Sequence, residues 1–154
     1  MRTSRRIAAG AGLVLVATLG LAAPALAGDH GKLVDADLVG SLKADPTLFG
    51  VTPGAVDWTV SDSSVQVKAD GEFDAKVRNL LVTATQANPV TTISASLACN
   101  GAVVSTSATV PFDAAGNARI KGMFTVPDRC LAPAVLLNPL GRAGVYIAAS
   151  GMAG

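Results

Sequence analysis

The chain of 154 residues has few aromatic side chains, few charges and a single histidine, His30. Only 4% of its residues are aromatic, so we expect the faces of its core to approach closely, with few large rings between them. A Ser–His or Cys–His nucleophile needs a histidine held inside the fold, and a zinc site needs several Cys or His ligands. The single histidine and the two cysteines therefore argue against such enzymes and zinc sites.

The one long uncharged apolar stretch lies at the N-terminus, where Arg2, Arg5 and Arg6 precede residues 7–22. Ala25-Leu26-Ala27 then places small residues at positions −3 and −1 of a cleavage site, and polar residues follow. The apolar stretch is short for a membrane span. These features predict a cleaved signal peptide over residues 1–27 and a secreted extracellular domain over residues 28–154 with no membrane attachment. We favour the general secretory route, and Ser4-Arg5-Arg6 keeps the twin-arginine route as the alternative.

A cluster of basic residues is missing from the predicted mature chain. Three of the 12 Lys and Arg residues belong to the predicted signal peptide, so nine remain against 11 acidic residues, and the net charge falls from +1 to −2. Nucleic-acid binding depends on the neutralisation of phosphates by clustered Lys and Arg. We therefore expect no nucleic-acid partner.

The only two cysteines, Cys99 and Cys130, are predicted to form a disulfide, because an exported chain folds in an oxidising compartment. A bridge that closes a loop of this length stabilises a fold by roughly 3–4 kcal/mol on the chain-entropy estimate. We expect this role to be structural.

No stretch after residue 27 repeats its apolar residues with the period of a helix. Short runs rich in Val, Ile, Thr and Ser alternate instead with Gly, Pro, Asn and Asp at intervals of roughly ten residues. This pattern predicts one all-β domain of about seven strands, a sandwich or a barrel, and of the two we expect an immunoglobulin-like antiparallel β-sandwich.

One hairpin is predicted residue by residue. A three-residue loop, 69–71, pairs Val67 with Phe73 and keeps the apolar residues of both strands on one face, which a two-residue loop would not do. The same register places Lys68 opposite Glu72, an attractive pair of charges.

A three-stranded meander is predicted to follow, with strands 91–99, 102–112 and 118–126. Its first turn is Asn100-Gly101, two residues that tolerate positive φ. Its third strand runs parallel to the first, so Cys130 emerges at the sheet edge where Cys99 ends.

Six carboxylates are candidates for a paired-carboxylate hydrolase: Asp35, Asp37, Asp57, Asp62, Glu72 and Asp74. Most of them fall in predicted turns or on outward-facing strand positions, where aspartate usually forms turns or solvated charges. The only aromatic residues with polar groups are Trp58 and Tyr146, and a lone tryptophan in a small sandwich is more often a core residue than a sugar platform. We expect a non-enzymatic protein and keep the hydrolase as an alternative.

The predicted mature N-terminus, Gly28-Asp29-His30, offers a second alternative. A free amine, two amide nitrogens and a histidine at the third position can form a square-planar set of four nitrogens, which suits Cu(II) or Ni(II). The sequence indicates no other cofactor.

Several phrases of the chain resemble those of small secreted proteins of actinobacteria: Leu38-Val39-Gly40-Ser41-Leu42, Ala87-Asn88-Pro89-Val90, Leu97-Ala98-Cys99-Asn100-Gly101 and Asp128-Arg129-Cys130-Leu131-Ala132-Pro133-Ala134. That group has no assigned activity, so the resemblance implies export and the cysteine pair and carries no functional residues. We therefore expect a secreted module that binds an extracellular protein or a cell-wall component.

Overall fold

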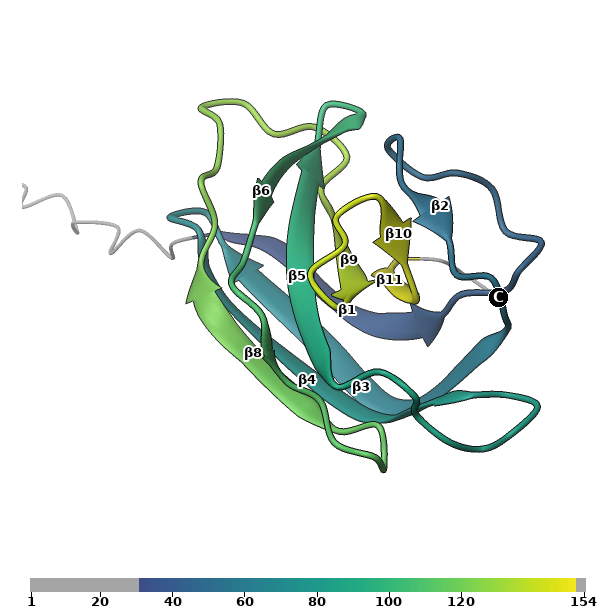
Figure 1. Cartoon of the computed structure of the whole chain (residues 1–154). Coiled ribbons are helices and arrows are strands. Elements are labelled where there is room, and N and C mark those ends of the chain that lie inside the picture. The colour runs from purple at the N-terminus through teal and green to yellow at the C-terminus, as the bar shows by residue number, and fades with distance from the viewer. Residues whose placement is uncertain (1–30, 152–154) are drawn as a thin grey trace, which may run out of the picture.

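The computed structural model describes residues 31–151, which form strands joined by turns and loops (Figure 1). In chain order the strands are β1 (Lys32–Gly40), β2 (Thr52–Pro53), β3 (Trp58–Lys68), β4 (Glu72–Val82), β5 (Thr92–Cys99), β6 (Ala102–Thr106), β7 (Val110–Pro111), β8 (Ala118–Met123), β9 (Ala134–Pro139), β10 (Val145–Tyr146) and β11 (Ala148–Ser150). The prediction of an all-β chain is confirmed for these residues. None of them forms a helix that could cross a membrane.

Nine strands form one curled sheet in the order β6-β5-β9-β11-β1-β3-β4-β8, with β7 also paired to β5. β1 holds this sheet together, because its residues 32–37 pair with β3 and its residues 38–40 pair with β11. The hydrogen-bonded path is continuous from β6 to β8, and the sheet is a half-barrel (Figure 1). An immunoglobulin-like sandwich of two separate sheets is therefore not confirmed.

The half-barrel has two parts that differ in burial. We term β1, β3, β4 and β8 the charged half, and β5, β6, β7, β9 and β11 the apolar half. Burial alternates along the strands of the charged half, as in β4, where Phe73, Ala75 and Val77 are buried and their neighbours are more exposed. In the apolar half, β5 and β9 are buried at almost every residue. The central strands of the apolar half are thus covered on both faces.

The segment between β1 and β3, residues 41–57, covers the outer face of the apolar half. A second core cluster joins Leu48, Phe49 and Val51 of this segment to Val103, Leu136 and Ala149 of the apolar half and to Tyr146 of β10, the short strand that pairs with β2. The Tyr146 hydroxyl donates a hydrogen bond of 2.9 Å to the Pro46 carbonyl. Burial, followed by the charge of Asp45, raises the pKa of Tyr146. Trp58 belongs to the main core, as predicted.

The predicted hairpin between β3 and β4 is confirmed. Val67 pairs with Phe73, the turn has Gly71 at φ 95°, and the Lys68 ammonium lies 2.6 Å from the Glu72 carboxylate. The hydrophobic alternation was sufficient here because both strands are adjacent in sequence and only one loop length keeps their apolar faces together.

The predicted meander is wrong in its third strand, because β8 pairs with β4 and not with the strand before it. Gly122 lies opposite Phe73, and a Cβ on Gly122 would lie 3.1 Å from the Phe73 ring. The Phe124 ring then stacks on Phe73, with ring centroids 3.9 Å apart. This fit of a large ring over a glycine explains the pairing of β8 with β4, across the open side of the half-barrel from β6.

The disulfide between Cys99 and Cys130 is confirmed, and the Cα atoms of the pair lie 4.9 Å apart. The Asn100-Gly101 turn is also confirmed, with φ values of 56° and 84°. The Asn100 side chain also holds the segment around Cys130: it donates a hydrogen bond of 2.8 Å to the Arg129 carbonyl and accepts one of 2.9 Å from the Leu131 N–H. The turn and the disulfide together fix the segment that leads from β8 in the charged half to β9 in the apolar half.

Candidate functional site

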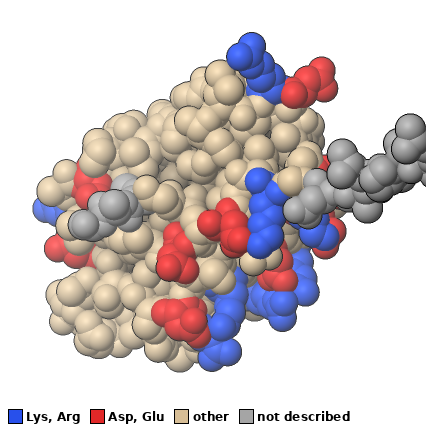
Figure 2. Space-filling model, turned by 180° about the vertical axis from the view of Figure 1, so that it is seen from behind, with Lys and Arg blue, Asp and Glu red and all other residues tan. Residues whose placement is uncertain are grey.

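Charged residues gather on the charged half of the sheet. Six of the nine Lys and Arg residues in residues 31–151 lie in its strands, whereas the strands of the apolar half contain no charged residue. The six ion pairs formed within this part of the chain all lie in the charged half: five join two of its strands, and Lys32–Asp35 lies within β1. In Figure 2, which views the molecule from behind, many of the charged side chains gather at the lower right, beside a large uncharged surface.

Four cations on β4 and β8 form a diagonal stripe, in the order Arg78, Lys76, Arg119 and Lys121. Lys76 lies opposite Arg119 in the strand register, and Asp74 lies opposite Lys121. Alternate residues of a strand point to the same face, so the four side chains share the outer face of the sheet. At about 3.4 Å per residue, their Cα atoms extend about 14 Å along the strands. We term these four residues the cationic stripe.

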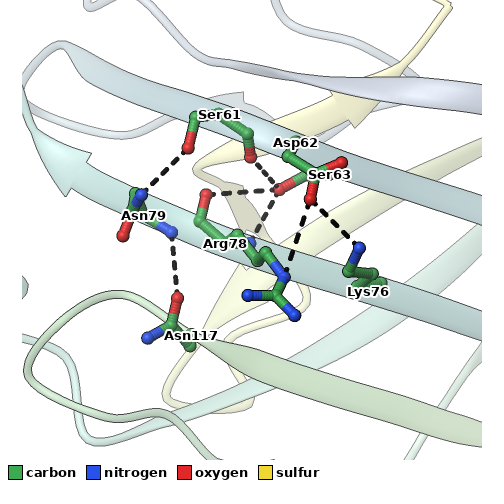
Figure 3. A network of polar contacts seen from close by, with 7 residues as sticks. All are labelled: Ser61, Asp62, Ser63, Lys76, Arg78, Asn79 and Asn117. Carbon is green, nitrogen blue, oxygen red and sulfur yellow. Dashed lines mark hydrogen bonds and ion pairs between the residues drawn. The ribbon is translucent and has the colours of Figure 1, made fainter.

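Asp62 of β3 neutralises one end of the stripe. Its Oδ2 lies 3.1 Å from Lys76 Nζ and 3.7 Å from Arg78 Nε (Figure 3). Asp62 sits where the register between β3 and β4 shifts, and its φ is 30°. The Ser63 hydroxyl donates to the Ser61 carbonyl at 2.9 Å and accepts from the Arg78 N–H at 2.8 Å. These hydrogen bonds hold the irregular backbone around Asp62 in place, and so they position its carboxylate for the ion pairs.

Asp74 of β4 neutralises the other end. Its two carboxylate oxygens accept hydrogen bonds of 3.0 and 2.6 Å from the Arg119 guanidinium, and Oδ2 lies 3.3 Å from Lys121 Nζ. The hydrogen bond from Arg119 is the main reason why the pKa of Asp74 is lowered, and Lys121 adds to the effect. Four cations therefore face two carboxylates, a local net charge of +2, although residues 31–151 contain nine basic and ten acidic residues.

These ion pairs contribute little to folding. The side chains of the stripe and its two carboxylates are between 39% and 74% exposed, and ion pairs in contact with water typically contribute less than about 1 kcal/mol. The side chains can accordingly exchange their partners for a ligand at small cost to the fold.

Two shallow hollows lie along the cationic stripe. The larger, of about 340 Å³, is lined by three of its cations and by Asn117, which accepts a hydrogen bond from the Asn79 N–H (Figure 3). The smaller, of about 200 Å³, contains Ser64 and Gln66 beside two of the cations. Guanidinium, ammonium, amide and hydroxyl donors thus converge, a set suited to carboxylate, phosphate or sulfate groups.

Five of the six carboxylates proposed for a hydrolase lie on β1, β3 and β4, and Asp57 precedes β3. Asp35 pairs with Lys32, which lowers its pKa, and Glu72 pairs with Lys68. Asp57 accepts a hydrogen bond from the Lys43 N–H. Asp57 and Asp74 each line a hollow, and no second member of the six lines either one.

The proposed metal ligands Gly28, Asp29 and His30 lie outside the described residues, as does the predicted signal peptide. Within residues 31–151 no three His, Cys, Asp or Glu side chains are placed to hold a metal ion.

Sequence reasoning missed the cationic stripe, although its parts are visible in the sequence. Lys76-Val77-Arg78 and Arg119-Ile120-Lys121 each present two cations on one strand face. Neither segment is a basic run, and the two become one site only because β8 pairs with β4.

Comparisons with protein-family models, with curated proteins and with solved structures gave no match to this chain. The resemblance to secreted actinobacterial proteins stays a prediction.

Proposed function

We propose that this protein is a non-enzymatic extracellular module that binds an acidic cell-surface polysaccharide through the cationic stripe. The observation that carries the proposal is the local charge of +2 on a rigid pair of strands, in a domain that is not basic as a whole. A linear polyanion can lie along the stripe across both strands, so that its successive acidic groups pair with successive cations. Electrostatic contacts of this kind weaken steeply with added salt.

The predicted export supports a ligand outside the cell. The immunoglobulin-like fold remains a prediction in this proposal. Intact-mass measurement of the protein from culture medium tests the export. The predicted mass is that of residues 28–154 less two hydrogens, with two thiols appearing on reduction; a chain that retains residues 1–27 would contradict it.

The binding proposal is tested with dextran sulfate as the probe and neutral dextran as its control. We expect the protein to bind dextran sulfate, with an affinity that falls as salt is added, and not to bind neutral dextran. In Lys76→Gln and in Arg119→Gln, the slope of the logarithm of the binding constant against the logarithm of the salt concentration should become shallower by about one. Lys68→Gln is the matched control, because it removes a cation that a single carboxylate already balances. The proposal would be contradicted if Lys68→Gln lost as much affinity for dextran sulfate as the other two variants. It would also be contradicted if the protein bound double-stranded DNA more tightly than dextran sulfate.

A further inference from the structure

A separate hollow of about 350 Å³ lies between the segment before β3 and the segment from β9 to β11. It shares no residue with the cationic stripe and has mostly apolar walls. Val56 and Leu140, both in its lining, are 44% and 46% exposed, although they are large hydrophobic residues. Ile147 and Trp58 come from the main core and are buried. A volume of this size falls within the range of small-molecule sites, about 300–1,000 Å³.

The indole of Trp58 supplies a hydrogen-bond donor in this apolar lining. Trp58 is only 5% exposed, and its side chain belongs to the lining of the hollow. Gly54 faces this atom, and a Cβ on Gly54 would lie 3.0 Å from Nε1 and 3.3 Å from Ile147 Cγ2. Glycine at this position therefore leaves the indole N–H uncovered.

Arg142 gives the hollow a positive charge. It is exposed, it belongs to the lining, and it is not a member of any ion pair within the described part of the chain. No carboxylate of residues 31–151 lines the hollow. An apolar wall, a neutral N–H donor and an exposed guanidinium therefore lie around one volume, and together they complement an apolar body that ends in an anionic acceptor.

We infer that this hollow binds a small amphiphilic carboxylate. The aliphatic part of the ligand contacts Val56, Leu140 and Ile147, and its carboxylate accepts hydrogen bonds from Trp58 Nε1 and from the Arg142 guanidinium. This inference is independent of the polysaccharide site, since neither the residues nor the ligand class are shared.

The test uses octanoate as the probe and octanol as its neutral counterpart. Trp58 is the only tryptophan, so its fluorescence reports on this hollow directly. We expect a saturable change in emission with octanoate, and an apparent Kd at least tenfold higher for octanol. No saturable response to octanoate, or equal affinity for the two compounds, would overturn the inference.

Three variants separate the contributions of the two polar groups. Arg142→Ala removes an exposed side chain and should weaken octanoate binding to the level of octanol. Arg129→Ala, the matched control, removes an exposed arginine outside the lining and should leave the Kd unchanged. Gly54→Ala should weaken octanoate binding although Arg142 is retained, because the added Cβ covers the indole N–H. Octanoate affinity that is unchanged in Arg142→Ala would also overturn the inference.

Discussion

The two halves of the sheet use their outer faces differently. In the apolar half the outer face is a second core, closed by residues 41–57, and its strands carry no charge. In the charged half the outer face remains in water and holds the six ion pairs of the described residues. The proposed function thus assigns recognition to the charged half, whereas the buried strands of the apolar half supply most of the apolar core, and β1 lies between the two halves.

This division explains why the cationic stripe can exist on a small domain. Strands buried on both faces supply the apolar area that folding needs, at about 25 cal/mol per Å² removed from water. The charged half can then keep exposed side chains that add little to stability.

The largest effect is expected from the disulfide, which anchors the connection from the charged half to the apolar half. Replacement of both Cys99 and Cys130 by alanine should lower the free energy of unfolding by roughly 3–4 kcal/mol, because the unfolded chain gains entropy. Urea unfolding of the two forms measures the difference. A loss below about 1 kcal/mol would mean that the asparagine turn alone holds this connection.

The next prediction compares the outer faces directly. Leu136→Ala, in the second core, should cost at least about 2 kcal/mol, whereas Met123→Ala, an apolar truncation on the outer face of the charged half, should cost less than about 0.5 kcal/mol. Thermal and urea unfolding of both variants test this contrast. Similar losses for the two variants would show that the halves are not divided as described.

The smallest effect concerns pH. The pKa of Asp74 is lowered in the folded state, so its ion pairs stabilise the fold above the unfolded pKa of about 3.9, and this contribution is lost as pH falls through the folded pKa. The contribution should be less than about 1 kcal/mol, because the carboxylate is 39% exposed. Asp74→Asn should therefore be slightly less stable than the native chain at pH 7 and equal to it near pH 2.

Asp37→Asn is the control for this measurement, since Asp37 is exposed and belongs to none of the ion pairs of residues 31–151. A difference between native and Asp74→Asn proteins that persists at pH 2 would point to packing and not to charge.

Local features of this fold were predictable from the sequence, and non-local pairings were not. The turns at Gly71 and Asn100-Gly101 follow from residues that accept positive φ, and the disulfide follows from the only two cysteines. The partner of β8 depends on how Phe73 covers Gly122, two residues far apart in the sequence, and the apolar alternation of residues 118–124 fits more than one neighbour. The cationic stripe depends on that pairing, so it could not be found before the pairing was known.

The hollow beside Trp58 could not be predicted for the same reason, because its walls come mainly from residues 53–58 and 139–147, which are far apart in the sequence. Gly54 has a specific place in this hollow, because a Cβ at this position would lie 3.0 Å from Trp58 Nε1.

The most direct test of the account is the affinity of Asp74→Asn for dextran sulfate at fixed moderate salt. This substitution removes one of the two carboxylates that balance the cationic stripe and raises the local charge from +2 to +3. If the stripe binds polyanions, the variant binds dextran sulfate more tightly than the native protein does. Unchanged or weaker binding by a folded Asp74→Asn protein would contradict the claim that the charged half is the recognition surface.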